Sequence, residues 1–407
     1  MPAAAPADPE PLPRGAIGWL ATAAFASALS LRVNDALLPR LVLEFGISLG
    51  TASQVIGLFA TAYGLAQLFF GPMGDRFGKY RVIGWAALAC TATAACCACA
   101  PGFGTLRVAR VLFGATCAAM IPLSMAWIGD VVPYERRQPL LARFLIGQIL
   151  GLSTGVWLGG FAADHASWRL PYVVIAVLFA GVAAGVLRLE RCLPAHARAT
   201  KPGSGHVPGR LVTEFAGVLA RPWARRILAI VFLEGVFLYG PFAFIATHAH
   251  HALGLSLSAA GALVMSFGLG GFAFSLTVGR LVGRLGEGGL ARWGGAIMGL
   301  ALLAIAFAPA WGWAVGACVA LGLGYYMLHN TLQVNATQMA PDRRGAAVAA
   351  FASCFFLGQS AGVALGGAWV VRLGTTSYIA FGAAGVMLTA AAFVALRRRH
   401  RLDAAAG

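Results

Sequence analysis

The chain has 407 residues, of which 59% are hydrophobic and only 11% are charged, a composition that excludes a soluble globular domain. Its formal net charge of +16 comes from basic residues that punctuate apolar blocks, so it indicates membrane topology and not a nucleic-acid-binding face. The apolar blocks run for about 20 residues, the length that a helix needs to cross a bilayer core of roughly 30 Å.

Twelve such segments follow from cutting the chain at its glycine, proline and charge clusters. We expect an all-α membrane protein with twelve transmembrane helices in two pseudo-symmetric six-helix bundles. Most Lys and Arg residues fall in the tails and in the loops on the same side, which the positive-inside rule places in the cytoplasm. The predicted location is a bacterial inner membrane, with both termini cytoplasmic. The segments lie near residues 15–40, 51–73, 82–101, 105–128, 140–163, 168–187, 226–247, 256–279, 290–309, 312–336, 345–371 and 376–396.

The longest loop divides the chain into two predicted halves. It contains RCLPAHARATKPGSGHVPGR, whose proline, glycine and basic residues are typical of a linker, or simply of a disordered basic loop. Gly114 recurs 208 residues later as Gly322 and, after a one-residue deletion, Gly155 recurs 207 residues later as Gly362. Parallel halves around a cavity are typical of a secondary transporter. The predicted organisation is a tail at 1–14, bundles at 15–187 and 226–396, a linker at 188–225 and a tail at 397–407.

A short charged stretch, GPMGDRFGKYR, separates the second and third segments at residues 71–81. It resembles the signature of the major facilitator superfamily in its glycines, its Asp75–Arg76 pair and its following basic residues, and the resemblance covers essentially the whole chain. The resemblance implies that the loop aspartate stabilises one conformer by pairing with neighbouring arginines and a helix N-terminus. A second interpretation is that these charges only anchor topology. The residues to which we assign a gating role are Gly71, Asp75, Arg76, Gly78, Arg136 and Arg137.

The fourth and fifth segments carry further features of that family. Arg110 lies deep in its segment, where a charge costs about 2.5–3.5 kcal/mol on insertion scales, so we expect it to have a partner or to face a wet cavity. With Gly114 it resembles the arginine-glycine motif of proton-driven members of the superfamily. In the fifth segment, Gly155 precedes Val156 where proton-coupled drug exporters have a glycine-proline pair, which weakens an assignment to drug antiport.

Two acidic side chains, Asp35 and Glu234, fall within predicted segments away from the cytoplasmic ends. Asp35 lies three residues after Arg32, so the two can pair on one helix face. Glu234 has no basic residue nearby in its segment, and the cost of a charge in the membrane makes it the principal candidate proton carrier. The alternatives are a structural Arg32–Asp35 neutralisation and a Glu234 that is permanently protonated or hydrogen-bonded. The proton-coupling candidates are Glu234, Asp35 and Arg110.

The tenth segment, GYYMLHNTLQVNATQ, has a polar stripe with helical spacing that runs as far as Thr337. Polar side chains against lipid are costly, so we expect the stripe to face the central cavity. His329 can bind substrate or relay protons, or it can form an interhelical hydrogen bond. The HNTLQ run resembles a bacterial branch of the superfamily named mostly as efflux permeases. The predicted substrate contacts are Arg32, Tyr325, Tyr326, His329, Asn330 and Gln333.

The whole sequence predicts a secondary transporter and not an enzyme. It contains no Gly-rich phosphate-binding loop and no nucleophile–base pair within the segments, and its one histidine cluster, THAHHALG, lacks further metal ligands, so no cofactor is expected. We expect proton-coupled efflux of a small organic compound by alternating access. The expected partners are substrate, protons and the bilayer, with no nucleic acid and a monomeric state. The alternatives are proton-coupled uptake of a metabolite or siderophore and a non-transporting membrane sensor.

Overall fold

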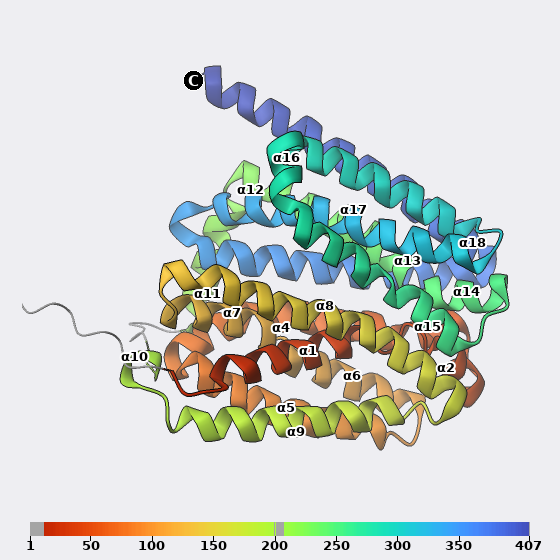
Figure 1. Cartoon of the computed structure of the whole chain (residues 1–407), viewed down its shortest axis with the longest axis horizontal. Helices are drawn as coiled ribbons and strands as arrows, with labels where there is room; N and C mark the ends of the chain where they lie inside the picture. Colours follow the sequence, from red (N-terminus) through yellow and green to blue (C-terminus); the bar gives the residue numbers. More distant parts are fainter. Residues whose placement is uncertain (1–11, 199, 201–206, 407) are drawn as a thin grey trace, which may run out of the picture.

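The computed structural model describes residues 12–198, 200 and 207–406, and their regular structure is entirely helical (Figure 1). The helices before the central linker are α1 (Ala16–Arg32), α2 (Leu38–Phe45), α3 (Leu49–Ala52), α4 (Gln54–Phe77), α5 (Lys79–Ala98), α6 (Phe103–Cys117), α7 (Met120–Val131), α8 (Tyr134–His165) and α9 (Leu170–Glu190). Two linker helices follow, α10 (Ala195–Arg198) and α11 (Val207–Leu219).

The remaining helices belong to the second part of the chain. They are α12 (Pro222–Glu234), the π-helix η1 (Gly235–Tyr239), α13 (Gly240–Phe242), α14 (Ile245–Leu253), α15 (Leu257–Met265), α16 (Phe267–Ala306), α17 (Trp311–Gln338), the 3₁₀ turn η2 (Pro341–Arg343) and α18 (Arg344–Ala406).

Nine helical stretches in the described part of the chain are long and apolar enough to cross a membrane. Two of them are interrupted by a glycine with positive φ, Gly286 (φ 62°) in α16 and Gly374 (φ 79°) in α18. Residues with a side chain rarely adopt a positive φ, whereas glycine does so without a steric penalty. Each of these long helices therefore consists of two helical segments joined at a glycine.

The charged stretch at residues 71–81 is not a loop, contrary to the expectation from sequence. Helix α4 continues through Asp75 and Arg76 to Phe77, and α5 begins at Lys79. Gly78 (φ 89°) alone makes the turn, and its N–H donates to the carbonyl of Gly74 at 3.0 Å. The charges therefore occupy the ends of two helices, where their positions are fixed by helical geometry.

The chain forms two layers of helices (Figure 1). Helices up to α9, red to yellow-green in the figure, form one layer, and helices from α12 onwards, green to blue, form the other. One apolar core lies mostly among residues before 200 and a second mostly among residues after 217. The layers contact each other mainly where α4 packs against α18 and α8 against α15.

Local structure repeats between the two layers at the spacing found in the sequence. Gly46 (φ 61°) and Gly254 (φ 64°) both end a helix, and they are 208 residues apart. At the same spacing, Ser48 caps α3 by accepting a hydrogen bond from the third residue after it, and Ser256 caps α15 in the same way. Similar sequences in the two layers therefore form the same turns.

Close helix packing repeats as well. A Cβ atom on Gly114 would lie 2.4 Å from the carbonyl oxygen of Phe59, and one on Gly322 would lie 2.0 Å from that of Phe267, 208 residues further on. Only glycine permits such an approach of two backbones. The equivalent contacts at a spacing of 207 residues are Gly151 with Phe25 and Gly358 with Phe232, and Gly155 with Leu29 and Gly362 with Val236.

The two layers touch most closely at one end of the bundle, which carries the turns near residues 46–53, 160–169 and 254–258. There a Cβ on Gly50 would lie 2.2 Å from the carbonyl oxygen of Gly367, and one on Gly160 would lie 2.2 Å from that of Leu257. We call this region the closed end of the bundle.

Candidate functional site

A buried acid and a histidine meet between two helices of the second layer. Glu234, the last residue of α12, is 0% exposed, and its Oε2 lies 2.9 Å from Nδ1 of His329 on α17. Its other oxygen, Oε1, has no hydrogen-bond partner among the described residues. A hydrogen bond between carboxyl and imidazole requires one proton between them, carried by either group. The pair therefore has the chemistry to hold and release a proton.

A change of helix type fixes the position of Glu234. The α-helix ends there and continues as the π-helix η1, a rare geometry that often marks functional sites. A Cβ on Gly235 would lie 2.4 Å from the carbonyl oxygen of Phe355, so this glycine lets η1 pack directly on α18. The helix type and the glycine together hold the carboxylate against α17 and α18.

Aromatic rings enclose the histidine. The ring centroid of His329 lies 4.9 Å from that of Tyr325, at an interplanar angle of 27°, and 4.8 Å from that of Phe355. Tyr239 meets Tyr325 edge to face at 5.4 Å. These rings cover most of the imidazole, whose side chain is 16% exposed, while the carboxyl is fully buried, and electrostatic interactions are stronger in such surroundings. The sequence predicted His329 and Tyr325 as substrate contacts, but in this conformer they surround Glu234.

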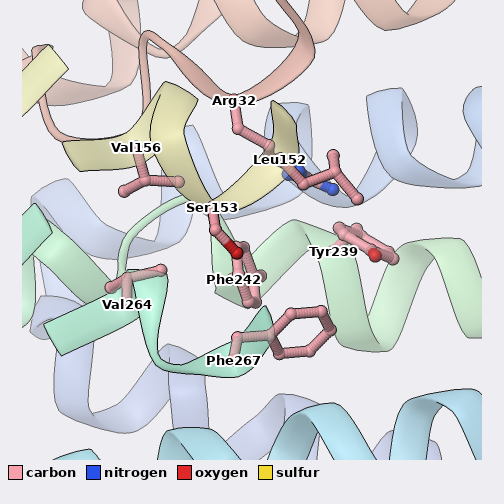
Figure 2. Close-up of a pocket in the computed structure, with 8 residues that line it drawn as sticks. All are labelled: Arg32, Leu152, Ser153, Val156, Tyr239, Phe242, Val264 and Phe267. Atoms are coloured by element: carbon pink, nitrogen blue, oxygen red, sulfur yellow. The ribbon is translucent and has the colours of Figure 1, made fainter. Parts of the chain in front are cut away.

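A small cavity lies between the two layers (Figure 2). Its volume is about 10 Å³, room for roughly one water molecule, so this conformer has no space for an organic substrate. The lining residues are Arg32, Leu152, Ser153 and Val156 from the first layer, and Tyr239, Phe242, Val264 and Phe267 from the second. Both layers therefore contribute to a site that changes when they move.

Arg32 is the charged residue of this lining. Its guanidinium lies 3.9 Å from the ring centroid of Tyr239 and 5.0 Å from that of Phe242. Its Nη1 lies 3.4 Å from Oδ2 of Asp35, which confirms the predicted pairing, and Asp35 is 0% exposed. Asp35 lies in the turn between α1 and α2. Arg32 thus contacts a carboxylate of its own layer and aromatic rings of the other.

Arg110 has partners, as predicted, but they are backbone carbonyls and not an acid. The side chain is 0% exposed; its Nε donates to the carbonyl of Val55 at 3.0 Å and its Nη1 to that of Ser30 at 3.4 Å. The guanidinium also lies 3.9 Å from the ring centroid of Phe59. Arg110 therefore ties α6 to α1 and α4 within the first layer.

In this conformer the polar stripe of α17 does not line this small cavity, so its contact with substrate stays a prediction. Of the six predicted substrate contacts, Arg32 lines it, whereas Tyr325, Tyr326, His329, Asn330 and Gln333 do not. Tyr326 packs against Gly271 and the ring of Phe274 on α16. Gln333 and Thr337, later on the stripe, are exposed. The stripe misses the cavity because α17 directs Tyr325 and His329 towards Glu234 instead.

Among the described side chains, Asp75 of the signature motif pairs with a lysine and not with an arginine. Nζ of Lys79 lies 2.8 Å from Oδ1 of Asp75 and 2.8 Å from Oδ2 of Asp130, near the end of α7. Arg76 lies over the ring of Phe77. The turn at Gly78 places Lys79, the first residue of α5, beside the carboxylate of Asp75 near the end of α4. The side chains of Arg136 and Arg137 lie outside the described ones.

Sequence reasoning missed several of these residues. Asp130 pairs with Lys79 of the motif, from which it lies 51 residues away in the chain, so no local sequence signal joins the two. Nothing in the sequence indicated that Tyr239 and Phe242 line the cavity, because aromatic residues are common in membrane helices. Among the described residues, no group of three or more His, Cys, Asp or Glu side chains could hold a metal ion.

The long apolar helices define a multi-pass membrane protein. The chain belongs to the Major Facilitator Superfamily, whose sequence profile matches residues 20–363. It is 26% identical over 362 residues to the uncharacterized MFS-type transporter YfhI of Bacillus subtilis (strain 168), covering 86% of this chain and 85% of that protein.

Other relatives match over shorter stretches. YwfA, another uncharacterized MFS-type transporter of Bacillus subtilis (strain 168), is 25% identical over 263 residues, which are 65% of this chain and 63% of YwfA. The efflux pump FUBT of Fusarium oxysporum is 28% identical over 166 residues, 41% of this chain and 27% of the pump. The chain therefore spans only part of the length of these two relatives.

Solved structures share the fold. A mutant of the nucleoside transporter NupG has a TM-score of 0.76 at 14% sequence identity and covers 93% of this chain and 99% of its own. A mutant of the peptide transporter POT has a TM-score of 0.75 at 16% identity and covers 94% of each chain. At these identities the likeness concerns the fold alone.

Proposed function

We propose that the protein is a proton-coupled exporter of a small organic compound that works by alternating access. It acts as a monomer in a bacterial inner membrane with both termini in the cytoplasm, and it binds substrate and protons but no nucleic acid. Its domains are a tail (1–14), a six-helix bundle (15–187), a linker (188–225), a second six-helix bundle (226–396) and a tail (397–407).

Twelve crossings are supported by the helices. Two of the nine long apolar stretches divide at Gly286 and Gly374, and Ala16–Arg32 is a further, shorter apolar helix. The repeated caps and glycine contacts support two equivalent bundles, since parallel repeats are a hallmark of this kind of transporter. With cytoplasmic termini, the closed end of the bundle faces outward.

The observation that carries the proposal is the position of Tyr239 between the cavity and the acid. Its ring lies against Arg32 in the cavity lining and against Tyr325, which stacks on His329, the partner of Glu234. A substrate that enlarges the cavity must displace Tyr239. That movement disturbs the rings around His329 and hence the proton held between His329 and Glu234.

The proposed cycle exchanges a proton for a substrate molecule. Glu234 and His329 take up a proton while the site faces outward, and substrate entering from the cytoplasm displaces Tyr239 and promotes release of that proton inside. Asp35 and Arg110 are assigned a supporting part in coupling, and the pairing of Asp75 with Lys79 a part in gating. Moving one charge down a membrane potential provides about 2.3 kcal/mol per 100 mV.

Uptake of a metabolite or siderophore is the second candidate. Arg32 favours it, because a cation among aromatic rings suits an anionic nutrient. The stretch shared with the efflux pump FUBT favours export. A non-transporting sensor would need neither the cavity nor the buried pair.

Reconstituted liposomes test the proposal. A pH-sensitive dye inside the vesicles reports proton movement when ethidium, benzoate or another small organic ion is added under an imposed pH gradient. We expect at least one compound in such a panel to release protons from wild-type vesicles and none to do so from Glu234→Gln vesicles. Glu44→Gln, which removes a partly exposed carboxylate of α2, is the matched control. Equal proton movement in Glu234→Gln and wild type would contradict the proposal, and movement of substrate with the proton would favour uptake.

A further inference from the structure

An acidic side chain joins the two layers at the closed end of the bundle. The carboxylate of Asp164, near the end of α8, accepts hydrogen bonds from the backbone N–H groups of Leu257 at 3.2 Å and Ser258 at 2.6 Å. These are the first two residues of α15, which belongs to the other layer.

The chemistry of this contact is that of a helix cap supplied by another part of the protein. The first N–H groups of a helix have no partner within it, and the aligned peptide dipoles place partial positive charge at that end. Within α15, Ser256 already accepts from Ala259. Asp164 satisfies two further N–H groups and brings a negative charge to the positive helix end.

The neighbouring contacts at this end carry no charge. Along the same seam, the hydroxyl of Ser258 donates to the carbonyl of Gly160 at 3.4 Å, and Gly160 and Gly261 approach the opposite backbone. On the parallel seam between α4 and α18, the hydroxyls of Thr61 and Ser360 lie 2.6 Å apart. Charge-assisted hydrogen bonds are stronger than neutral ones. Asp164 therefore makes a charged contribution to a junction that otherwise consists of close backbones and hydroxyl groups.

We propose that Asp164 stabilises the conformer in which this end of the bundle is closed, because it caps α15 only when the two layers are in contact. When this end opens, α8 and α15 separate and α15 loses two N–H partners and a counter-charge. Asp164 is thus a positioning residue that sets the ratio of the two conformers, and it acts at the opposite end of the bundle from Asp75.

Hydrogen–deuterium exchange of the purified full-length protein in detergent tests this inference without substrate and without a transport assay. The wild type is compared with Asp164→Asn, which keeps the size of the side chain and removes its charge. Peptides from residues 254–265 report on α15 itself. Peptides from residues 46–57 and 363–375 report on the parallel seam, which Asp164 does not contact, and peptides from α9 are the internal reference.

If Asp164 controls the closed end, both seams exchange faster in Asp164→Asn, by roughly three- to tenfold, since the population of the open conformer rises. Faster exchange confined to residues 254–265 would overturn the inference, because it would show only fraying of α15. No change would overturn it as well. Asp164→Ala repeats the test in case Asp164→Asn does not fold, and Glu44→Gln, at the same end but paired with Arg40 and Arg169 of its own layer, should leave both seams unchanged.

Discussion

The carboxylate of Glu234 on α12 lies 2.9 Å from the imidazole of His329 on α17, and aromatic rings pack against this imidazole. Two groups at this distance share one proton site, so a substitution at either should affect both.

Replacing Glu234 by glutamine should abolish uphill transport. Glutamine keeps the shape of the side chain but cannot exchange a proton under these conditions. Coupling to one charge supports about fifty-fold accumulation per 100 mV. In vesicles with an imposed proton gradient, the variant should therefore only equilibrate its substrate, while exchange of labelled for unlabelled substrate continues. Retention of wild-type accumulation would remove Glu234 from the coupling mechanism.

The effects of substituting the two partners should not add. Glu234→Gln, His329→Gln and the double variant should lose similar amounts of coupled transport, because residues that act as one unit are non-additive. The measurement is the initial rate of proton-driven transport for the four proteins, with binding of substrate checked separately. Independent losses that multiply in the double variant would show that the two side chains act separately.

Arg32→Lys should weaken substrate binding while leaving the protein folded. Lysine keeps the positive charge but loses the flat guanidinium that lies 3.9 Å from the centroid of Tyr239, a contact worth about 0.5–2 kcal/mol. An increase in KM of roughly two- to thirtyfold, with a smaller change in the maximal rate, is expected. Arg40→Lys, on the partly exposed Arg40–Glu44 pair, is the control and should behave as wild type.

Gly114→Ala and Gly322→Ala should each destabilise the fold, and by similar amounts. In both, the new methyl group would meet a backbone carbonyl, at 2.4 Å and 2.0 Å respectively, so the helices must move apart at a cost of about 1–3 kcal/mol. Gly316→Ala, on α17 with open space around it, should not destabilise. Thermal unfolding in detergent provides the comparison. A large difference between the first two variants would argue against equivalent packing in the two layers.

Lys79→Met should leave Asp75 and Asp130 close together without the cation between them. Both carboxylates are nearly half exposed, so the loss of stability should be small, at most about 1 kcal/mol, and should shrink in high salt. Unfolding midpoints at low and high ionic strength measure it. Arg76→Met, which removes a charge of the same sign from the neighbouring helix end, should have no salt-dependent effect of this size.

The sequence allowed the family, the helical membrane fold and the positions of the buried charges to be predicted. A charged residue in an apolar segment can be recognised from the sequence alone, so Asp35, Arg110 and Glu234 could be identified as candidate site residues. The partners of these side chains could not all be identified in this way. His329 lies 95 residues from Glu234, and helical periodicity gives the face of a residue but not the helix that this face meets.

The cavity lining was harder to predict for the same reason. Polar residues are easily recognised in an apolar segment of sequence. Aromatic residues are not, although Tyr239, Phe242 and Phe267 form one wall of the cavity. The turn at Gly78 was misjudged because a cluster of glycine and proline is typical of loops, and in α4 Pro72 and Gly74 are instead accommodated within the helix. Twelve crossings and two bundles remain predictions from sequence, supported here by the glycine breaks and repeats.

The glycine contacts at the closed end have a consequence for the conformational change. Where Gly50 meets Gly367 and Gly160 meets Leu257, backbone lies directly against backbone. Glycine has no side-chain rotamers to reorder when such surfaces separate. In the proposed cycle, these contacts therefore add little side-chain reordering to the opening of this end.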